Sequence, residues 1–225
     1  MRRKILLLVL VLGLVAAAHP AGLRADFRAW GGLTIGRYHG QPQPVGIPEL
    51  RYQNAWRTGF GLGAGLELRM SRAPLSFILG LGYLQKGSEL EIYYLDTKTG
   101  SYLFRLGTLS QSGLVKIGPD KKIAPYLLAG YELAFILSHR GQPFGPSPGG
   151  PDSDLKPDTR KLDPGLVAGV GLEFKLEKIS PFIEICYFHG LSNLSLGKGT
   201  LEYYETIKSR ALILSAGLKF GRKKT

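Results

Sequence analysis

The stretch Pro164–Leu176, PGLVAGVGLEFKL, indicates most clearly how this chain folds. In an extended strand, successive side chains point to opposite faces, so alternate residues share a face. One face of this stretch is wholly apolar and consists of Leu166, Ala168, Val170, Leu172, Phe174 and Leu176. The other face is rich in glycine and charge, with Gly165, Val167, Gly169, Gly171, Glu173 and Lys175. A helix would mix the two sets, so the pattern predicts a β-strand with one face against an apolar medium.

The same period-two pattern recurs along the chain. In Gly59–Arg69 and in Ala211–Phe220, apolar side chains again occupy one whole face of an extended segment. Most segments of this kind have at least about 10 residues, the length that a tilted strand needs to cross a bilayer. We predict eight strands, at residues 28–39, 55–69, 75–87, 102–117, 123–138, 164–176, 179–191 and 209–220.

The connections between these strands alternate strictly between short and long. The short turns are 69–74, 118–122 and 177–178, and the long connections are 40–54, 88–101, 139–163 and 192–208. Membrane barrels have short periplasmic turns and longer outer loops, so we expect both chain ends in the periplasm. Gln142–Pro157 contains five prolines, and we expect it to be an exposed loop that forms no strand ladder.

The first 25 residues have the composition of a secretory signal peptide. Three basic residues precede the apolar run Ile5–Val15, which is too short to span a membrane as a helix. We expect cleavage after Ala25, or after Ala18 by the small-x-small pattern, which leaves a barrel domain at 26–225; an uncleaved anchor helix is the alternative. The sequence has one cysteine, Cys186, so an intramolecular disulfide cannot form.

These features predict an all-β chain, an eight-stranded antiparallel up-and-down transmembrane β-barrel in the outer membrane of a Gram-negative bacterial cell. The mean hydropathy of +0.02 fits, because only one face of each strand must be apolar. The formal charge is +12, and cleavage after Ala25 would lower it to +8 by removing four basic residues. Export argues against a nucleic-acid partner. We expect membrane lipids and lipopolysaccharide phosphates as partners, with a merely solubilising surface as the alternative.

Three segments resemble the outer membrane β-barrel domain of porin-like and PorT-like proteins, a group of OmpA-like eight-stranded barrels. They are Leu81–Gly87, Leu114–Ile117 with Pro125–Gly130, and Gly169–Phe174 with Glu184–Leu194. The resemblance covers the mature chain and implies the same fold, with the barrel-assembly machinery as a partner during biogenesis. Two departures concern the interior. The family often has Glu near Gly80, and Arg where this chain has Cys186.

Charged residues on the glycine-rich strand faces must point into the barrel, because Lys or Arg at the bilayer midplane costs about 2–4 kcal/mol. We predict a structural lumen network of Glu67, Arg69, Lys86, Lys116, Glu132, Glu173, Lys175, Glu184 and Lys219. Strand order suggests the pairs Lys116 with Glu132 and Lys219 with Glu184. An eight-stranded barrel is narrow enough to be filled by its side chains. A proton or ion path is the alternative.

The sequence predicts no catalytic residue, no cofactor and no metal site. His39 and His139 are placed at loop edges, and His189 on an outward face near a strand end. They lie on separate segments, and neither nearby serine has an acidic residue to orient the histidine. Cys186 falls on the inward face, where a small buried thiol is the default.

The function that best fits these features is a structural or interaction barrel, not an enzyme, that displays extracellular loops. A narrow channel or porin-like transporter is an alternative, because the barrel is closed and charged inside. A lipid-modifying enzyme of the outer membrane and a soluble exported binding barrel are further alternatives. The sequence does not choose a ligand or solute.

Overall fold

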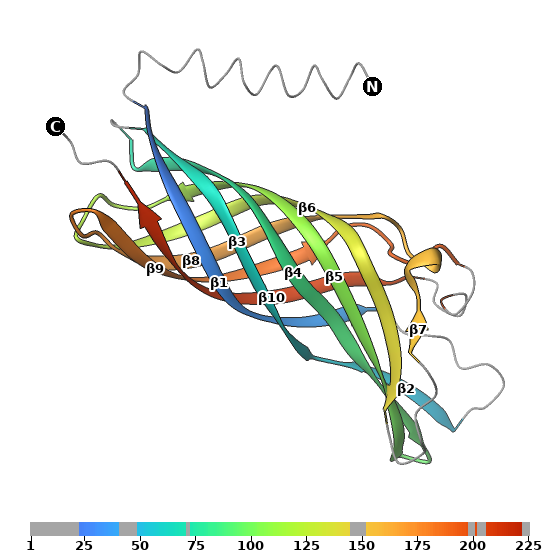
Figure 1. Ribbon diagram of the computed structural model, residues 1–225. Helices are drawn as coiled ribbons and strands as arrows, with labels where there is room; N and C mark the ends of the chain where they lie inside the picture. Colours follow the sequence, from blue (N-terminus) through green and yellow to red (C-terminus); the bar gives the residue numbers. More distant parts are fainter. Residues whose placement is uncertain are drawn as a thin grey trace, which may run out of the picture.

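The computed structural model describes residues 23–40, 49–70, 73–144, 152–197, 201 and 206–221, and these are almost entirely β-strand (Figure 1). The strands are β1 (Leu23–His39), β2 (Leu50–Ala55), β3 (Arg57–Met70), β4 (Leu75–Tyr94), β5 (Thr97–Ile117), β6 (Ile123–Phe144), β7 (Ser153–Asp154), β8 (Leu162–Phe174), β9 (Ile179–Gly190) and β10 (Lys208–Phe220), with one 3₁₀ turn, η2 (Lys156–Asp158). Among the described residues, no helix is long and apolar enough to cross a membrane.

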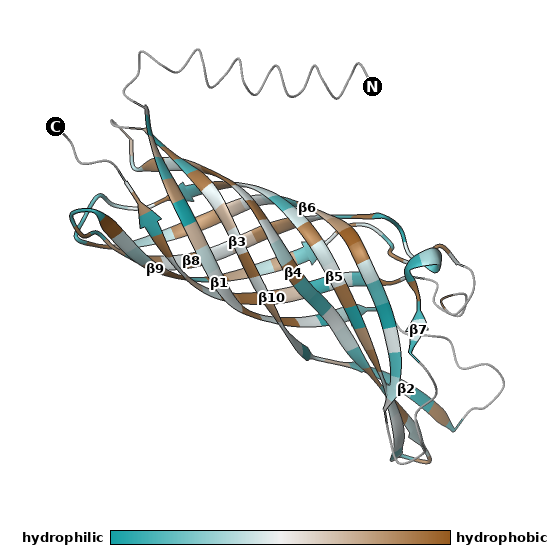
Figure 2. Cartoon of the chain, viewed as in Figure 1, coloured by the Kyte–Doolittle hydropathy of each residue, from teal (hydrophilic) through white to brown (hydrophobic). Residues whose placement is uncertain are grey.

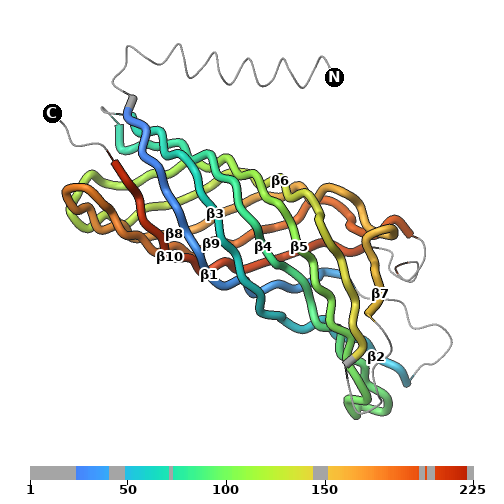
Figure 3. The backbone as a smooth tube through the Cα atoms, viewed as in Figure 1, coloured from blue at the N-terminus to red at the C-terminus, as the bar shows by residue number. Residues whose placement is uncertain are grey.

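Eight of these strands form a closed antiparallel ring in the order β3-β1-β10-β9-β8-β6-β5-β4, which the β3–β4 pairing completes. The first and last ring strands in sequence, β1 and β10, pair from Phe27–Phe220 to His39–Lys208. The predicted eight-stranded, antiparallel, all-β barrel is therefore confirmed. We call the end with the short turns the turn end and the opposite end the loop end; β1 begins and β10 ends at the turn end (Figures 1 and 3).

Alternate side chains on each strand separate into a lumen set and an outer set. Leu214 is 48% exposed and its neighbour Ser215 is 6% exposed; Glu173 is 1% exposed. Exposed apolar residues such as Leu33, Leu127 and Leu214 form an outer belt around the ring, and Figure 2 shows this alternation as brown bands crossing the strands. The predicted register, with Leu214 outward and Ser215 and Glu173 inward, is confirmed.

Glycines on the inner face make room for aromatic rings. A Cβ atom at Gly171 would lie 2.4 Å from the ring of Tyr126, and one at Gly63 would lie 2.7 Å from the ring of Trp30. Both rings therefore lie flat against backbone inside the barrel. The glycine-rich strand faces of the sequence are the walls of a packed lumen.

The predicted long connection at 88–101 is wrong. β4 and β5 continue past the ring and pair up to Tyr94–Thr97, and Leu95 and Asp96 form the turn with φ values of 48° and 60°. β2 pairs with the same extension of β4. The outer side of this extension carries Glu89 and Glu91, whereas Leu90 faces inward and is buried. The outer apolar face that marked the other strands is therefore missing here, although the ladder is complete.

The prediction that Gln142–Pro157 forms no ladder is also wrong in part. Gln142 and Pro143 continue β6 and pair with Leu103 and Tyr102 of β5, and Ser153 and Asp154 pair with β6 as β7 (Figure 3). Proline is tolerated at a sheet edge, where its missing N–H removes no ladder bond. Residues 145–151 of this segment, and 41–48 of the connection before β2, lie outside the described residues.

Candidate functional site

A cluster of alternating charges crosses the lumen in its turn-end half. The Nζ atom of Lys116 lies 3.1 Å from Glu67 Oε1 and 2.5 Å from Glu173 Oε2. The Nζ atom of Lys219 lies 2.5 Å from Glu173 Oε1 and 3.5 Å from Glu67 Oε1. Arg69 joins both carboxylates from the mouth, at 3.8 and 3.7 Å. Each buried carboxylate therefore has two or more cationic neighbours, which is the condition for keeping a charge inside a barrel.

A second ion pair crosses the middle of the lumen between β1 and β9. Arg28 Nη2 lies 2.6 Å from Glu184 Oε1, and the hydroxyl of Tyr126 donates to the same oxygen at 2.8 Å. The guanidinium of Arg28 stacks over the ring of Phe182 at 4.2 Å. Strands on different sides of the ring are thus joined through one carboxylate.

A third group lies toward the loop end. Lys86 Nζ is 2.7 Å from Glu132 Oε1, Ser110 donates to that oxygen at 3.0 Å, and the ammonium lies 3.2 Å from the ring centroid of Phe188. Lys86 is 2% exposed. Protein atoms therefore surround the ammonium group of Lys86, and no open path to solvent passes through this group.

The individual pairs differ from those that strand order suggested. Lys116 does not contact Glu132, and Lys219 does not contact Glu184. In the β5–β6 ladder, Lys116 faces Leu128, and in the β9–β10 ladder Lys219 faces Ser180. Each expected partner lies four residues further along its strand, which is roughly 13 Å at 3.3 Å per residue. Charged side chains pair across the lumen when they lie at the same level along the barrel axis. That level depends on the stagger between neighbouring strands.

The lumen network differs from the predicted one at three further residues. Lys175 lies just after β8, where it pairs with Asp120 of the turn after β5, so it lies at the rim of the turn end and not in the lumen network. Asp26 and Arg28 were missed, and they are 6% and 4% exposed. The sequence could have indicated their position, because Asp26 and Arg28 alternate with Phe27 and Ala29 and therefore share the face of Trp30 on the first strand.

A cavity of about 720 Å³ opens at the turn end and stops at the charge cluster. Its walls include Arg24, Ser76, Tyr126 and Lys178, and its floor is formed by Glu67, Lys116, Glu173 and Lys219. In the middle of the lumen, a second cavity of only 70 Å³ lies among Arg28, Trp30 and Cys186. The larger cavity is a vestibule that ends inside the barrel.

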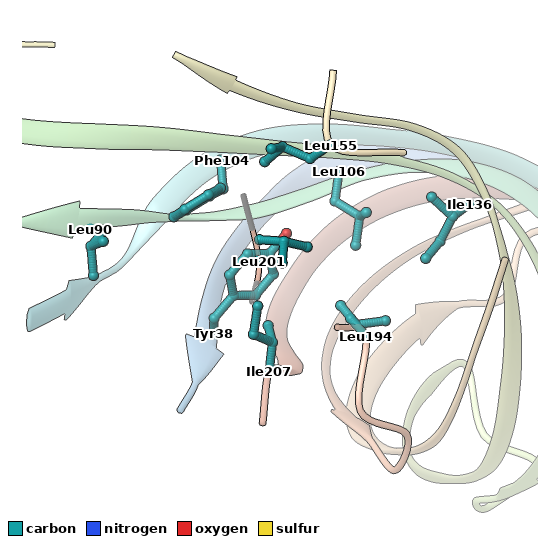
Figure 4. Close-up of a cluster of buried hydrophobic side chains, with 9 residues drawn as sticks. All are labelled: Tyr38, Leu90, Phe104, Leu106, Ile136, Leu155, Leu194, Leu201 and Ile207. Carbon is teal, nitrogen blue, oxygen red and sulfur yellow. The ribbon is translucent and has the colours of Figure 1, made fainter. Parts of the chain in front are cut away.

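An apolar plug closes the loop end. It consists of nine buried side chains from the ring strands and the segments above them: Tyr38, Leu90, Phe104, Leu106, Ile136, Leu155, Leu194, Leu201 and Ile207. Figure 4 shows these side chains, which come from several strands and from the segments beyond them. Leu155, Leu194 and Leu201 are 0% exposed, so chain segments outside the ring fold inward and fill its mouth.

Beside the plug, His139 is held in a chain of hydrogen bonds. Its Nε2 atom lies 3.1 Å from the hydroxyl of Tyr38, and its Nδ1 atom 2.7 Å from Thr159 Oγ1. Thr159 donates to the carbonyl of Leu155 at 2.6 Å. A neutral imidazole with its proton on Nδ1 satisfies all three contacts. Burial lowers the pKa of His139 to about 4, and the expected position at a loop edge is wrong.

The remaining candidate residues stay apart. Cys186 is buried at 8% exposure on the inner face, as predicted, and His39 and His189 lie on β1 and β9. Among the described residues, no group of three His, Cys, Asp or Glu side chains could hold a metal ion.

A model of the family described as outer membrane protein β-barrel domain matches residues 18–196, most of the chain. The chain belongs to this outer membrane β-barrel family. It is therefore an outer membrane protein of Gram-negative bacteria, and lipid surrounds its belt. No protein with a curated description matches the sequence.

Three solved structures illustrate the likeness of fold to this outer membrane barrel. Neisserial surface protein A is 18% identical, with a TM-score of 0.45 over 88% of this chain and 99% of that one. OprG from Pseudomonas aeruginosa is 13% identical, with a TM-score of 0.48 over 89% and 97%. The outer membrane protease OmpT from Escherichia coli is 10% identical, with a TM-score of 0.40 over 89% and 96%. Identities this low concern the fold alone.

The pairing in the lumen of this outer membrane barrel can be tested by double-mutant cycles. Glu184→Gln strands the buried Arg28 and should lower the free energy of unfolding by about 3–5 kcal/mol. Adding Arg28→Met should recover much of the loss, with a coupling energy of about 1–3 kcal/mol, whereas Glu184→Gln with Lys219→Met should be additive within about 0.5 kcal/mol. Urea unfolding in lipid vesicles of wild type, the single variants Glu184→Gln, Arg28→Met and Lys219→Met, and the two double variants gives both coupling energies. Coupling to Lys219 in place of Arg28 would contradict the described pairing.

His139 should make the barrel less stable in mild acid. The unfolded state takes up a proton near the ordinary pKa of about 6.5, whereas the native state does so only near 4. The contribution of His139 to the free energy of unfolding is therefore fully present above pH 6.5, and it falls by up to about 3 kcal/mol as the pH is lowered toward 4. His139→Gln should remove this slope. Asp163 has a pKa raised by burial and titrates in both proteins, so the difference between their urea midpoints isolates His139. Parallel slopes would show that His139 takes up its proton equally in both states.

Proposed function

We propose that this outer membrane barrel is a closed anchor that holds an extended β-structure outside the cell. The observation that carries the proposal is the blocked lumen. Ion-pair clusters block the lumen between the turn-end vestibule and its middle, and the apolar plug around Leu155 and Leu194 fills the loop end. A barrel without a continuous passage acts through its ends and its outer surface.

The exposed structure at the loop end is a sheet of strand extensions. β4 and β5 project beyond the belt with β2 alongside (Figure 1). Ion pairs brace the tip, where Lys98 lies 2.7 Å from Glu91 and Arg51 lies 3.1 Å from Asp96. Leu95 is 64% exposed. Its neighbour Tyr94 is 46% exposed, so two adjacent apolar side chains at the tip are open to a partner, and the proposal is of interaction and not of catalysis.

The proposal places the loop end outside the cell and both ends of the barrel chain in the periplasm. Its partners are the surrounding lipids, lipopolysaccharide at the outer leaflet and the assembly machinery during biogenesis. We also infer cleavage of the signal peptide after Ala18. β1 begins at Leu23 and Leu23–Ala25 pair with β3, so cleavage after Ala25 would remove three paired residues.

A narrow channel is the second candidate, because the cavity of about 720 Å³ enters the barrel from the turn end. Transport through it would need the Lys86–Glu132 pair and the plug to move together. The closed anchor requires no such movement and is the function that we favour.

Thiol labelling of intact cells tests the orientation and the closure together. In a Cys186→Ser background, Asp96→Cys at the hairpin tip should react with a membrane-impermeant maleimide. Lys121→Cys at the turn end is the matched control and should react only after the outer membrane is permeabilised. Wild-type protein, whose only thiol is the buried Cys186, should stay unlabelled. Labelling of Lys121→Cys but not of Asp96→Cys in intact cells would invert the barrel, and rapid labelling of Cys186 would show an open lumen.

A further inference from the structure

The loop-end edge of the apolar belt carries basic side chains on adjacent strands. Arg37 of β1 and Arg210 of β10 are direct cross-strand partners, and Arg210 in turn faces His189 of β9. His39 and Lys208 face each other two residues further out. We call these five residues, Arg37, His39, His189, Lys208 and Arg210, the basic patch.

The patch has no anionic partner among the described residues, since none of its members is in an ion pair. The Nε atom of Arg210 is buried without a hydrogen-bond partner in that part of the chain. The charged residues beside His39 in the β1–β10 ladder, Arg37, Lys208 and Arg210, are all cationic. Like charges directly opposite each other destabilise a strand pair, so the patch is incomplete without an anion.

The surroundings of the patch indicate where that anion comes from. One step toward the turn end, Ile35 faces Leu212, and Leu212 faces Tyr187; Leu212 and Tyr187 are exposed on the belt. The guanidinium of Arg37 lies 5.9 Å from the ring of Trp56, which is 49% exposed. Aromatic side chains beside an apolar belt mark the level of the lipid headgroups. An anion bound here can have acyl chains that continue down the belt.

A second Arg pair lies across the ring, where Arg105 of β5 faces Arg140 of β6. The repulsion between these two arginines is offset by their neighbours, because Arg105 donates a hydrogen bond to Gln142 at 3.2 Å and Arg140 faces Asp154 of β7. The turn-end edge is different: Phe27 faces Phe220 at a ring distance of 6.2 Å.

We propose that the basic patch binds the phosphate groups of the outer-leaflet glycolipid, with Arg37 and Arg210 gripping one phosphate between them and the acyl chains packing along Leu212 and Tyr187. Arginine suits this role, because its planar fork binds phosphate oxygens in pairs. The inference rests on the proposed orientation, with the loop end outside. Its test is a binding measurement in detergent solution, which does not depend on orientation and so can fail independently of the labelling experiment.

The test compares bis-phosphorylated lipid A with its dephosphorylated form, added to the folded full chain in an uncharged detergent and counted by native mass spectrometry. For the double variant Arg37→Gln with Arg210→Gln, we expect about tenfold weaker binding of bis-phosphorylated lipid A. The matched control, Lys121→Gln with Lys122→Gln at the turn end, removes the same charge and should change binding by less than about twofold. Arg37→Lys with Arg210→Lys should fall between wild type and the glutamine variant.

Folding of each variant is checked by its altered gel migration without boiling. The comparison of the two lipids on wild-type protein needs no variant, and dephosphorylated lipid A should bind about tenfold more weakly. Equal binding of the two lipids would overturn the proposal, as would equal losses in the glutamine variant and the turn-end control. Displacement of lipid A by inorganic phosphate at equal concentration would overturn it as well, because the patch would then select a free anion and not a lipid.

Discussion

A hydrocarbon layer offers no hydrogen-bond partner to a backbone N–H or C=O, so a strand that crosses it must pair on both sides. In this chain the pairing of β1 with β10 meets that requirement, because it joins the two ends of the ring over thirteen residue pairs. Closure leaves no free strand edge within the belt. Closure also determines where side chains point, since every residue of a ring strand within the belt faces either the lipid or the lumen.

The sorting explains why so many charges lie inside. Charges at the level of the apolar belt cannot face the hydrocarbon, so Glu67, Lys116 and Glu173 lie inside the barrel and neutralise the charges of their partners. Inward glycines such as Gly171 leave room for Tyr126, which supports the next carboxylate, Glu184. The interior is thus filled as a consequence of closure, and what remains for function are the belt edges, the vestibule and the sheet beyond the loop end.

The strands and their outward faces could be predicted from the sequence wherever contact with lipid requires alternate residues to be apolar. The outward face of β10, with Leu212, Leu214 and Leu218, could be predicted because every alternate residue there is apolar. The extension of β4 and β5 could not, because Glu89 and Glu91 lie outside the bilayer, where no apolar face is needed. The ion pairs depend on the stagger between strands, so Arg28 and Glu184 could be assigned to the lumen by parity but not to each other.

Electrical recording in a planar bilayer tests whether the barrel is closed along its axis. Wild-type protein, refolded and verified by its heat-dependent migration, should give no steady ion conductance at either polarity. An eight-stranded barrel filled by its own side chains leaves no aqueous path. Stable openings of about a nanosiemens, the scale expected of an aqueous pore, would contradict the account, and they would make transport through the vestibule the function of the protein.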